Sequence, residues 1–167
     1  DDPPEVDWQG GRYISRLILV GPPNTGAAEA LQSLLKGWKY SWLMPRFQPA
    51  LIATFPSVYQ LLPRPRHRIF TDASGSAVAV DVYDVDFWEQ NKLGIFSADQ
   101  EKYLRYLLPD AESPRTAARN YVRAALIRAR RVHQALDIRP ARGCPAEIYL
   151  FTANTVPTRN RAELTGS

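Results

Sequence analysis

The chain has 167 residues, and its 45% hydrophobic and 11% aromatic content excludes a disordered or collagen-like protein. Its single cysteine, Cys144, excludes an intramolecular disulfide framework, and with only two histidines the sequence predicts no metal or other cofactor. The net charge of +4, from 17 Arg and 4 Lys against 17 acidic residues, permits an anionic partner without requiring one. The longest uncharged stretch, 47–63, contains three prolines, so no membrane span is expected.

The first pattern along the chain is a strand, a turn and a helix. Residues 13–20 end in a continuous apolar, β-branched run that predicts a buried strand, and the turn 21–26 (GPPNTG) follows at once. Apolar positions share one face of residues 27–36, which predicts a helix capped by Asn24 or Thr25. The turn lacks the Gly-Lys-Ser/Thr ending of a phosphate-binding loop, and its prolines lack the amide donors that a phosphate needs. The pattern therefore indicates an α/β unit without a phosphate site.

An aromatic segment interrupted by prolines comes next, from residue 38 to about 65. No single period fits it, so it predicts short helices and turns. Trp38, Trp42, Met44 and Phe47 lie within ten residues of one another and are the candidate contacts to an apolar substrate. The alternative is that these side chains are the ordinary core of a cap.

Residues 68–83 predict a hairpin whose arms are 68–71 and 78–83. Asp81, Asp84 and Asp86 follow its second arm and lack the central Gly and terminal Glu of a calcium loop. We therefore expect a solvated strand end rather than a metal site.

Two helices with clear start signals precede a last strand. Ser97 and Gln100 have the spacing of a capping box, which predicts a helix to about Leu108. Ser113 followed by Pro opens a second helix to about residue 136, and 146–153 predicts another buried strand. The apolar positions of the second helix predict a buried stripe of Ala118, Val122, Ala125, Leu126, Ala129, Val132 and Leu136.

Arginines and histidines are the remaining polar candidates. Seven arginines lie between residues 119 and 142, and we expect most of them on a solvated helix face. A polyanion site is the alternative, although the face offers few amide or aromatic side chains for base contacts, so a nucleic-acid partner is not expected. His67 is expected in an exposed loop, and His133 at the surface or boundary of the helix.

Several stretches resemble the bacterial members of the lecithin:cholesterol acyltransferase-like group of α/β-hydrolases. Residues 16–31 are similar to that group's strand, Gly-Thr-Pro turn and helix. The stretch 55–63 (FPSVYQLLP) is the most specific match, and 81–84 with Trp88 continues it. Residues 146–158 are similar to the next core strand, so the resemblance spans roughly residues 8 to 158.

The resemblance implies that residues 1–167 form one incomplete α/β-hydrolase domain. It would contain two core strands with flanking helices and a lid or cap insertion over 38–112. The turn departs from the family at Pro22, where Thr is usual, and at Ala27, where Ser is usual. The family's serine elbow precedes the first of these strands, and its Asp and His follow the last.

The implied function is part of a serine hydrolase or acyltransferase that acts on lipid or other apolar esters. None of the three catalytic residues falls in this chain, so the chain alone should be inactive. The expected partners are an apolar ester and the missing parts of the same domain, as suits a piece excised from a longer protein. The alternative is a non-catalytic interaction module that binds an anionic or apolar partner through the Arg-rich helix 116–136 or the aromatic segment 38–55.

Overall fold

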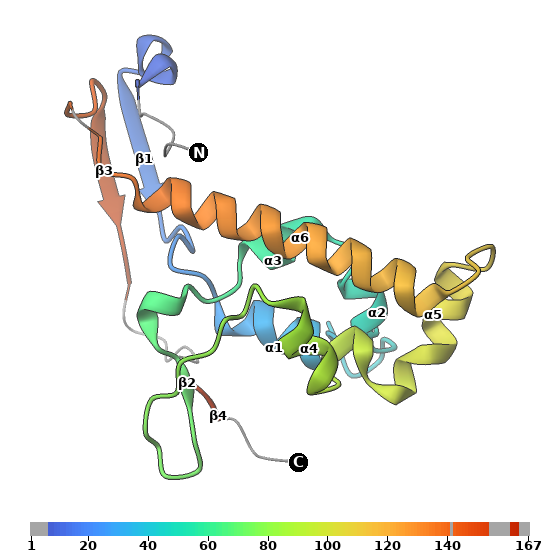
Figure 1. The fold of residues 1–167 in the computed structure, drawn as a ribbon. Helices are drawn as coiled ribbons and strands as arrows, with labels where there is room; N and C mark the ends of the chain where they lie inside the picture. Colours follow the sequence, from blue (N-terminus) through green and yellow to red (C-terminus); the bar gives the residue numbers. More distant parts are fainter. Residues whose placement is uncertain (1–6, 141, 154–160, 164–167) are drawn as a thin grey trace.

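A computed structural model describes residues 7–140, 142–153 and 161–163. It combines helices with two small parallel sheets (Figure 1). The α-helices are α1 (Ala28–Lys36), α2 (Pro49–Ile52), α3 (Pro56–Gln60), α4 (Val85–Gln90), α5 (Glu101–Leu107) and α6 (Pro114–Asp137). The strands are β1 (Arg16–Val20), β2 (Phe70–Thr71), β3 (Glu147–Phe151) and β4 (Ala162–Glu163). Four 3₁₀ segments complete the order: Gln9–Tyr13, Pro65–His67, Gly94–Phe96 and Ala98–Gln100.

Helix α6 organises the helical part of the molecule and begins where the sequence predicts. The Ser113 hydroxyl accepts a hydrogen bond from the Thr116 amide, and Pro114 occupies the first helical position. Its predicted stripe is buried from Ala118 to Ala129, which confirms most of the prediction. The last part is wrong: Val132 and Leu136 are exposed. The buried residue there is His133, because this end of the helix packs against polar groups that the imidazole can bond.

The helical layer has a closed core. Tyr59, Leu62, Phe96 and Leu126 are almost fully buried between α6 and the short helices beneath it. The predicted short helices of the aromatic segment are confirmed as α2 and α3, each opened by a proline at its first position. The Tyr59 hydroxyl donates to the Ala53 carbonyl at 3.0 Å, so this buried polar group is satisfied.

Helix α1 forms as predicted but without the predicted cap. Ala27, not Asn24 or Thr25, occupies the N-cap position, and no side chain bonds the first amides. The reason is the intervening Gly26, whose φ of +85° turns the chain away from the helix axis. A Cβ on that glycine would lie 2.3 Å from the Leu62 carbonyl oxygen, so the turn is held closely against the end of α3.

The predicted hairpin forms only at its tip. The Val78 amide donates to the Phe70 carbonyl, and Thr71 pairs with Ala77, but the second arm does not continue as a strand. Instead β2 pairs in parallel with β4. The chain then turns into α4, whose N-cap is Asp84.

Two further predictions about polar residues are wrong. The expected solvated strand end at 81–86 is a helix start, since the Asp84 carboxylate accepts the Asp86 amide at 2.9 Å. The expected capping box at Ser97 does not form either. Gln100 is buried, and its side-chain oxygen accepts a hydrogen bond from the Ala50 amide at 3.1 Å. The Gln100 side chain is therefore engaged by a distant residue and does not bond the start of its own helix. A helix follows nevertheless, as a 3₁₀ turn and then α5.

Strands β1 and β3 form a parallel pair at one end of the molecule (Figure 1). The register places Arg16 beside Glu147 and Val20 beside Phe151. Both strands were predicted and both are confirmed, but their predicted burial is wrong. Nine of the ten residues are exposed and the tenth is intermediate, because no described helix covers either face of the pair. Ile18 and Leu150 are each 63% exposed.

Candidate functional site

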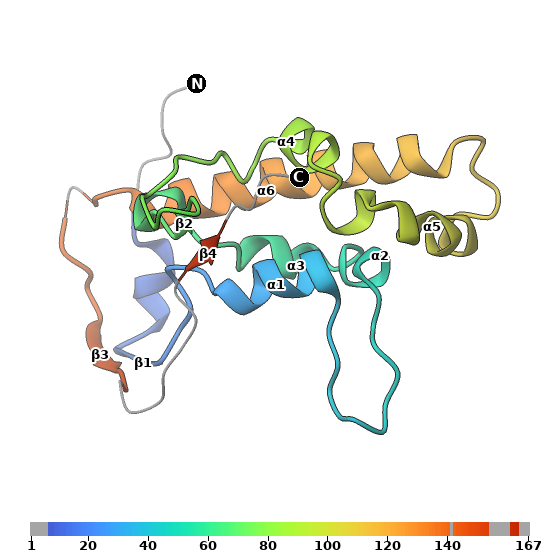
Figure 2. The same ribbon diagram turned by 90° about the horizontal axis from the view of Figure 1, so that it is seen from below.

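The loop between α1 and α2, residues 38–47, carries several exposed aromatic side chains, and we call it the aromatic loop. It projects away from the helical layer (Figure 2). Its base is closed by two backbone hydrogen bonds, from the Trp38 amide to the Phe47 carbonyl at 2.9 Å and from the Phe47 amide to the Trp38 carbonyl at 2.8 Å. The two rings stack with centroids 6.2 Å apart. Gly37 makes this entry possible, since its φ is +71° and a Cβ there would meet the Phe47 carbonyl oxygen at 2.2 Å.

The four predicted contact residues all lie on this loop, but they differ in how far their side chains are exposed. Phe47 is half-buried and packs against the core cluster. Trp38 and Met44 are 47% and 44% exposed, and Trp42 is 82% exposed. A role as ordinary core is therefore excluded for Trp38, Trp42 and Met44 in this chain. Their role in binding a substrate stays a prediction.

Arg64 is a buried cation that no sequence pattern singles out. It is 4% exposed and lies between two prolines where the chain leaves α3. Its guanidinium donates to the Asn24 carbonyl at 3.1 Å and to the His133 carbonyl, and it forms an ion pair with Asp137. The pKa of Asp137 is lowered by the hydrogen bond from Arg64. Arg64 thus links the turn 21–26 to the C-terminal end of α6.

His133 and Tyr83 lie on the other side of the same cluster. The His133 Nε2 lies 2.7 Å from the Gln60 carbonyl, which can only accept, so Nε2 carries a proton. In the neutral imidazole Nδ1 then accepts from the Tyr83 hydroxyl at 2.6 Å. Burial raises the pKa of Tyr83, which keeps the phenol protonated as a donor. The surface or boundary position predicted for His133 is wrong, since the residue is buried. Its helical spacing from Leu126 and Ala129 places it on the buried stripe.

The arginines of α6 divide into two groups. Arg115 and Arg119 form ion pairs with Glu89, Arg119 also pairs with Asp86, and Arg130 pairs with Asp81. Three others are exposed and have no ion pair with any residue in the described ranges: Arg123, Arg128 and Arg131. The solvated helix face predicted from sequence therefore holds for these three. Arg115, Arg119 and Arg130 instead link α4 and the segment before it to α6.

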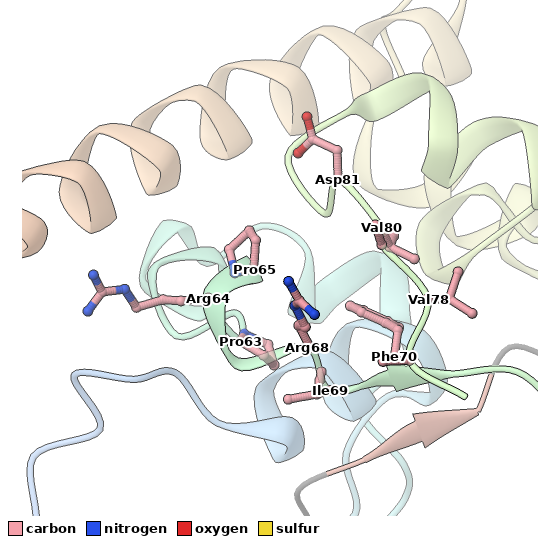
Figure 3. A pocket seen from close by; sticks show the side chains of 11 residues that line it. Pro63, Arg64, Pro65, Arg68, Ile69, Phe70, Val78, Val80 and Asp81 are labelled. Atoms are coloured by element: carbon pink, nitrogen blue, oxygen red, sulfur yellow. The ribbon is translucent and has the colours of Figure 1, made fainter. Parts of the chain in front are cut away.

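A pocket of about 480 Å³ lies between residues 63–70 and 77–81. Its walls are mainly apolar, with Phe70 and Val80 on one side (Figure 3). The guanidinium of Arg68 lies among these side chains, whereas Arg64 points away from them. Arg68 has a φ of +45°, which is uncommon for a residue other than glycine. The pocket holds no pair of titratable groups in position for acid–base chemistry.

No serine hydroxyl is hydrogen-bonded to a histidine within the described ranges. Neither histidine hydrogen-bonds a serine hydroxyl there, since His133 bonds Tyr83 and Gln60, and the exposed His67 accepts from Arg66. Ser74, in the stretch nearest to a serine elbow, instead closes a turn by donating to the Asp72 carboxylate at 2.6 Å. That turn also lowers the pKa of Asp72 through the hydrogen bonds it accepts. The part of the chain that the structure describes therefore contains no serine–histidine pair for acyl transfer.

Neither a cluster of metal-binding side chains nor a membrane-spanning helix occurs in the described ranges. No three His, Cys, Asp or Glu side chains there are grouped closely enough to hold a metal ion. None of the helices there has the length and apolar content needed to cross a bilayer.

Comparison with known proteins finds no matching family model, no similar curated protein and no matching solved structure. What the chain does is therefore inferred from its own residues and geometry.

Proposed function

We propose that the chain is part of a serine hydrolase or acyltransferase that acts on lipid or other apolar esters. In this proposal the triad comes from residues outside the chain. The serine would attack the ester carbonyl, release the alcohol and pass the acyl group to water or to a second alcohol. The described residues would supply two strands of the core and the cap over the substrate.

The observation that carries the proposal is the exposed parallel pair of β1 and β3. Parallel sheets are normally covered on both faces, and their strands are therefore apolar on both sides. Here the apolar side chains point to both faces, as at Leu17 and Ile18 on β1 and at Ile148 and Tyr149 on β3, and all four are exposed. A pair of this kind fits the interior of a larger sheet, with further strands and helices supplied from elsewhere.

The connection between the two strands supports the same proposal. Both strands run in the same direction, so the turn 21–26 leaves β1 at the edge where β3 also ends. In open α/β sheets this carboxyl edge is where ligands bind. The helical layer is inserted between the strands in sequence, as a cap on such a sheet would be, and it carries the aromatic loop.

The test compares this chain with the polypeptide encoded by the whole reading frame that contains it. Both are treated with a fluorophosphonate probe, which labels activated serines, and assayed with p-nitrophenyl esters. We expect the longer polypeptide to be labelled on a serine outside residues 1–167 and to hydrolyse the esters, with both lost when that serine becomes Ala. The chain alone should be unlabelled. A labelled serine within residues 1–167, or a longer polypeptide with neither labelling nor turnover, would overturn the proposal.

A second candidate function is an interaction module for an anionic partner. The observation in its favour is the exposed group of Arg123, Arg128 and Arg131, which has no carboxylate partner in the described ranges. Binding of DNA or RNA that weakens steeply with salt would favour this function, because phosphate contacts release counterions. We expect no such binding, since the helix presents few side chains suited to bases.

A further inference from the structure

The tip of the aromatic loop exposes three consecutive apolar residues. Trp42 is 82% exposed, Leu43 73% and Met44 44%, and Tyr40 beside them is 72% exposed. Soluble proteins seldom leave a contiguous apolar group of this kind in water unless it meets a partner. These residues belong to the loop between α1 and α2, which projects away from the helical layer (Figure 2).

The loop presents this tip from a rigid base. The backbone bonds between Trp38 and Phe47 and the stacking of their rings fix its two ends, and Phe47 anchors it on the core. Trp38 also contacts Tyr40 edge to face, with centroids 5.7 Å apart. A loop whose two ends are already held together loses less conformational entropy on binding than a free segment would.

The charged residues in and next to the aromatic loop are all basic. Lys36 ends α1, Lys39 and Arg46 lie on the two sides of the loop, and none of the three pairs with a carboxylate in the described ranges. Arg46 is held near the base, where its guanidinium donates to the Lys36 carbonyl at 3.4 Å. The sequence contains no Asp or Glu between Glu29 and Asp72.

We propose that the aromatic loop docks the protein on an anionic lipid bilayer surface. Trp42, Leu43 and Met44 would enter the acyl-chain boundary, and Lys36, Lys39 and Arg46 would contact the anionic head groups. Tryptophan and tyrosine suit this boundary because each combines an apolar ring with a polar group. Charge complementarity favours a lipid surface over a protein partner, because the loop combines an apolar tip with cations and no anions. An anionic bilayer can bind both features without a groove of matching shape.

The inference deepens the proposed function, and it rests on that function for the view that the bilayer holds the ester substrate. Docking itself needs no catalysis, so the two proposals can fail separately. Hydrolysis of a dissolved short-chain ester by the longer polypeptide, without vesicle binding, would overturn docking alone. Vesicle binding by a longer polypeptide without turnover would overturn the hydrolase alone.

The test is vesicle flotation of the chain with two lipid compositions. One is phosphatidylcholine alone, and the other is an equimolar mixture of phosphatidylcholine and phosphatidylglycerol. We expect binding to the mixed vesicles, weakened at least about tenfold by the double change Trp42→Ala and Leu43→Ala, since both side chains lose apolar burial. The matched control is Tyr106→Ala, because Tyr106 is 83% exposed on α5 and should not matter.

Charge is tested by two triple variants that remove the same number of cations. Lys36→Gln, Lys39→Gln and Arg46→Gln together should weaken binding by about five-fold per cation, roughly a hundredfold in all. Arg123→Gln, Arg128→Gln and Arg131→Gln on α6 should leave it nearly unchanged. Circular dichroism confirms that each variant retains its helices.

Several results would overturn docking on an anionic bilayer. These are failure to bind the mixed vesicles, equal binding to both compositions, or equal losses in the two triple variants. A fourth is that the wild-type chain does not bind vesicles but self-associates, and that the self-association disappears in the Trp42 and Leu43 variant. That last result would assign the loop to a contact with a second copy of the chain.

Discussion

The helical layer and the strand pair make opposite use of apolar residues. In the helical layer, Leu126 and Leu62 are 0% exposed, and buried polar groups such as Gln100 and the Tyr59 hydroxyl have partners. In the strand pair, equally apolar side chains face solvent on both sides. The difference indicates that the helical layer is stabilised by contacts within this chain, whereas the strand pair has the composition of a core without its cover.

The largest expected effect separates the two regions directly. Leu126→Ala should lower the free energy of unfolding by about 2–5 kcal/mol, because it removes a fully buried side chain and leaves a cavity. Leu150→Ala in β3 should change it by less than about 0.5 kcal/mol, since that side chain is 63% exposed. Urea denaturation of both variants measures the comparison. Equal losses would show that the strand pair is also held by packing within the chain.

A second prediction concerns the buried cation that joins the turn after β1 to the helical layer. Arg64→Met should destabilise by about 1–3 kcal/mol, because it removes the hydrogen bonds to two carbonyl groups and to Asp137. Arg66→Met is the matched control, since Arg66 is exposed and contacts the same carboxylate. Its loss should be no more than about 1 kcal/mol. Thermal or urea unfolding of the two variants measures both losses of stability. Equal losses would contradict the role given to Arg64.

A third prediction sharpens the hydrogen-bonding of His133. Tyr83→Phe removes the hydroxyl that donates to Nδ1 and should cost about 0.5–1.5 kcal/mol of stability. Tyr106→Phe, at an exposed position, should be neutral. The chemical shifts of the His133 ring nitrogens should report the protonated Nε2 in the wild type. A protonated Nδ1 at neutral pH would contradict the assigned donor and acceptor.

The smallest expected effect is the pH dependence of the stability that the Asp137 carboxylate contributes. Because hydrogen bonding from Arg64 lowers the pKa of Asp137, its carboxylate stabilises the folded state above its unfolded pKa of about 3.9. That contribution is lost as pH falls through the lower folded pKa. The stability difference between the wild type and Asp137→Asn should therefore be constant from neutral pH to about pH 5 and shrink below about pH 4. A difference that does not change with pH would contradict the ion pair.

Local sequence patterns were sufficient for the longest elements. The Ser-Pro start of α6, the apolar face of α1 and the β-branched run of β1 each act through neighbouring residues, so they can be recognised without the fold. Some of the predictions that failed concern groups whose hydrogen-bond partners lie far away in the sequence. Gln100 bonds Ala50 instead of its own helix start, and no local pattern signals that choice.

The sequence predicted that residues 38–47 form an apolar, aromatic segment, but not which of their side chains are exposed. The cluster of aromatic residues at 38–47 marks an apolar segment, yet whether it faces inward or outward depends on the space that α1 and α2 leave. The structure turns Trp42 outward and Phe47 inward. Arg64 and Tyr83 were missed because their partners lie far away in sequence, whereas the spacing of His133 along α6 could have revealed it.

Accessibility of the strand pair tests most directly whether the chain is part of a larger hydrolase sheet. Ile18→Cys and Leu150→Cys are made singly in a Cys144→Ser background, with Tyr106→Cys on α5 as an exposed control, and labelled with a maleimide. In the chain alone, the strand cysteines should react as fast as the control. In the polypeptide from the whole reading frame, we expect them to become protected while the control stays reactive. Equally fast labelling of the strand cysteines in both proteins would contradict the account.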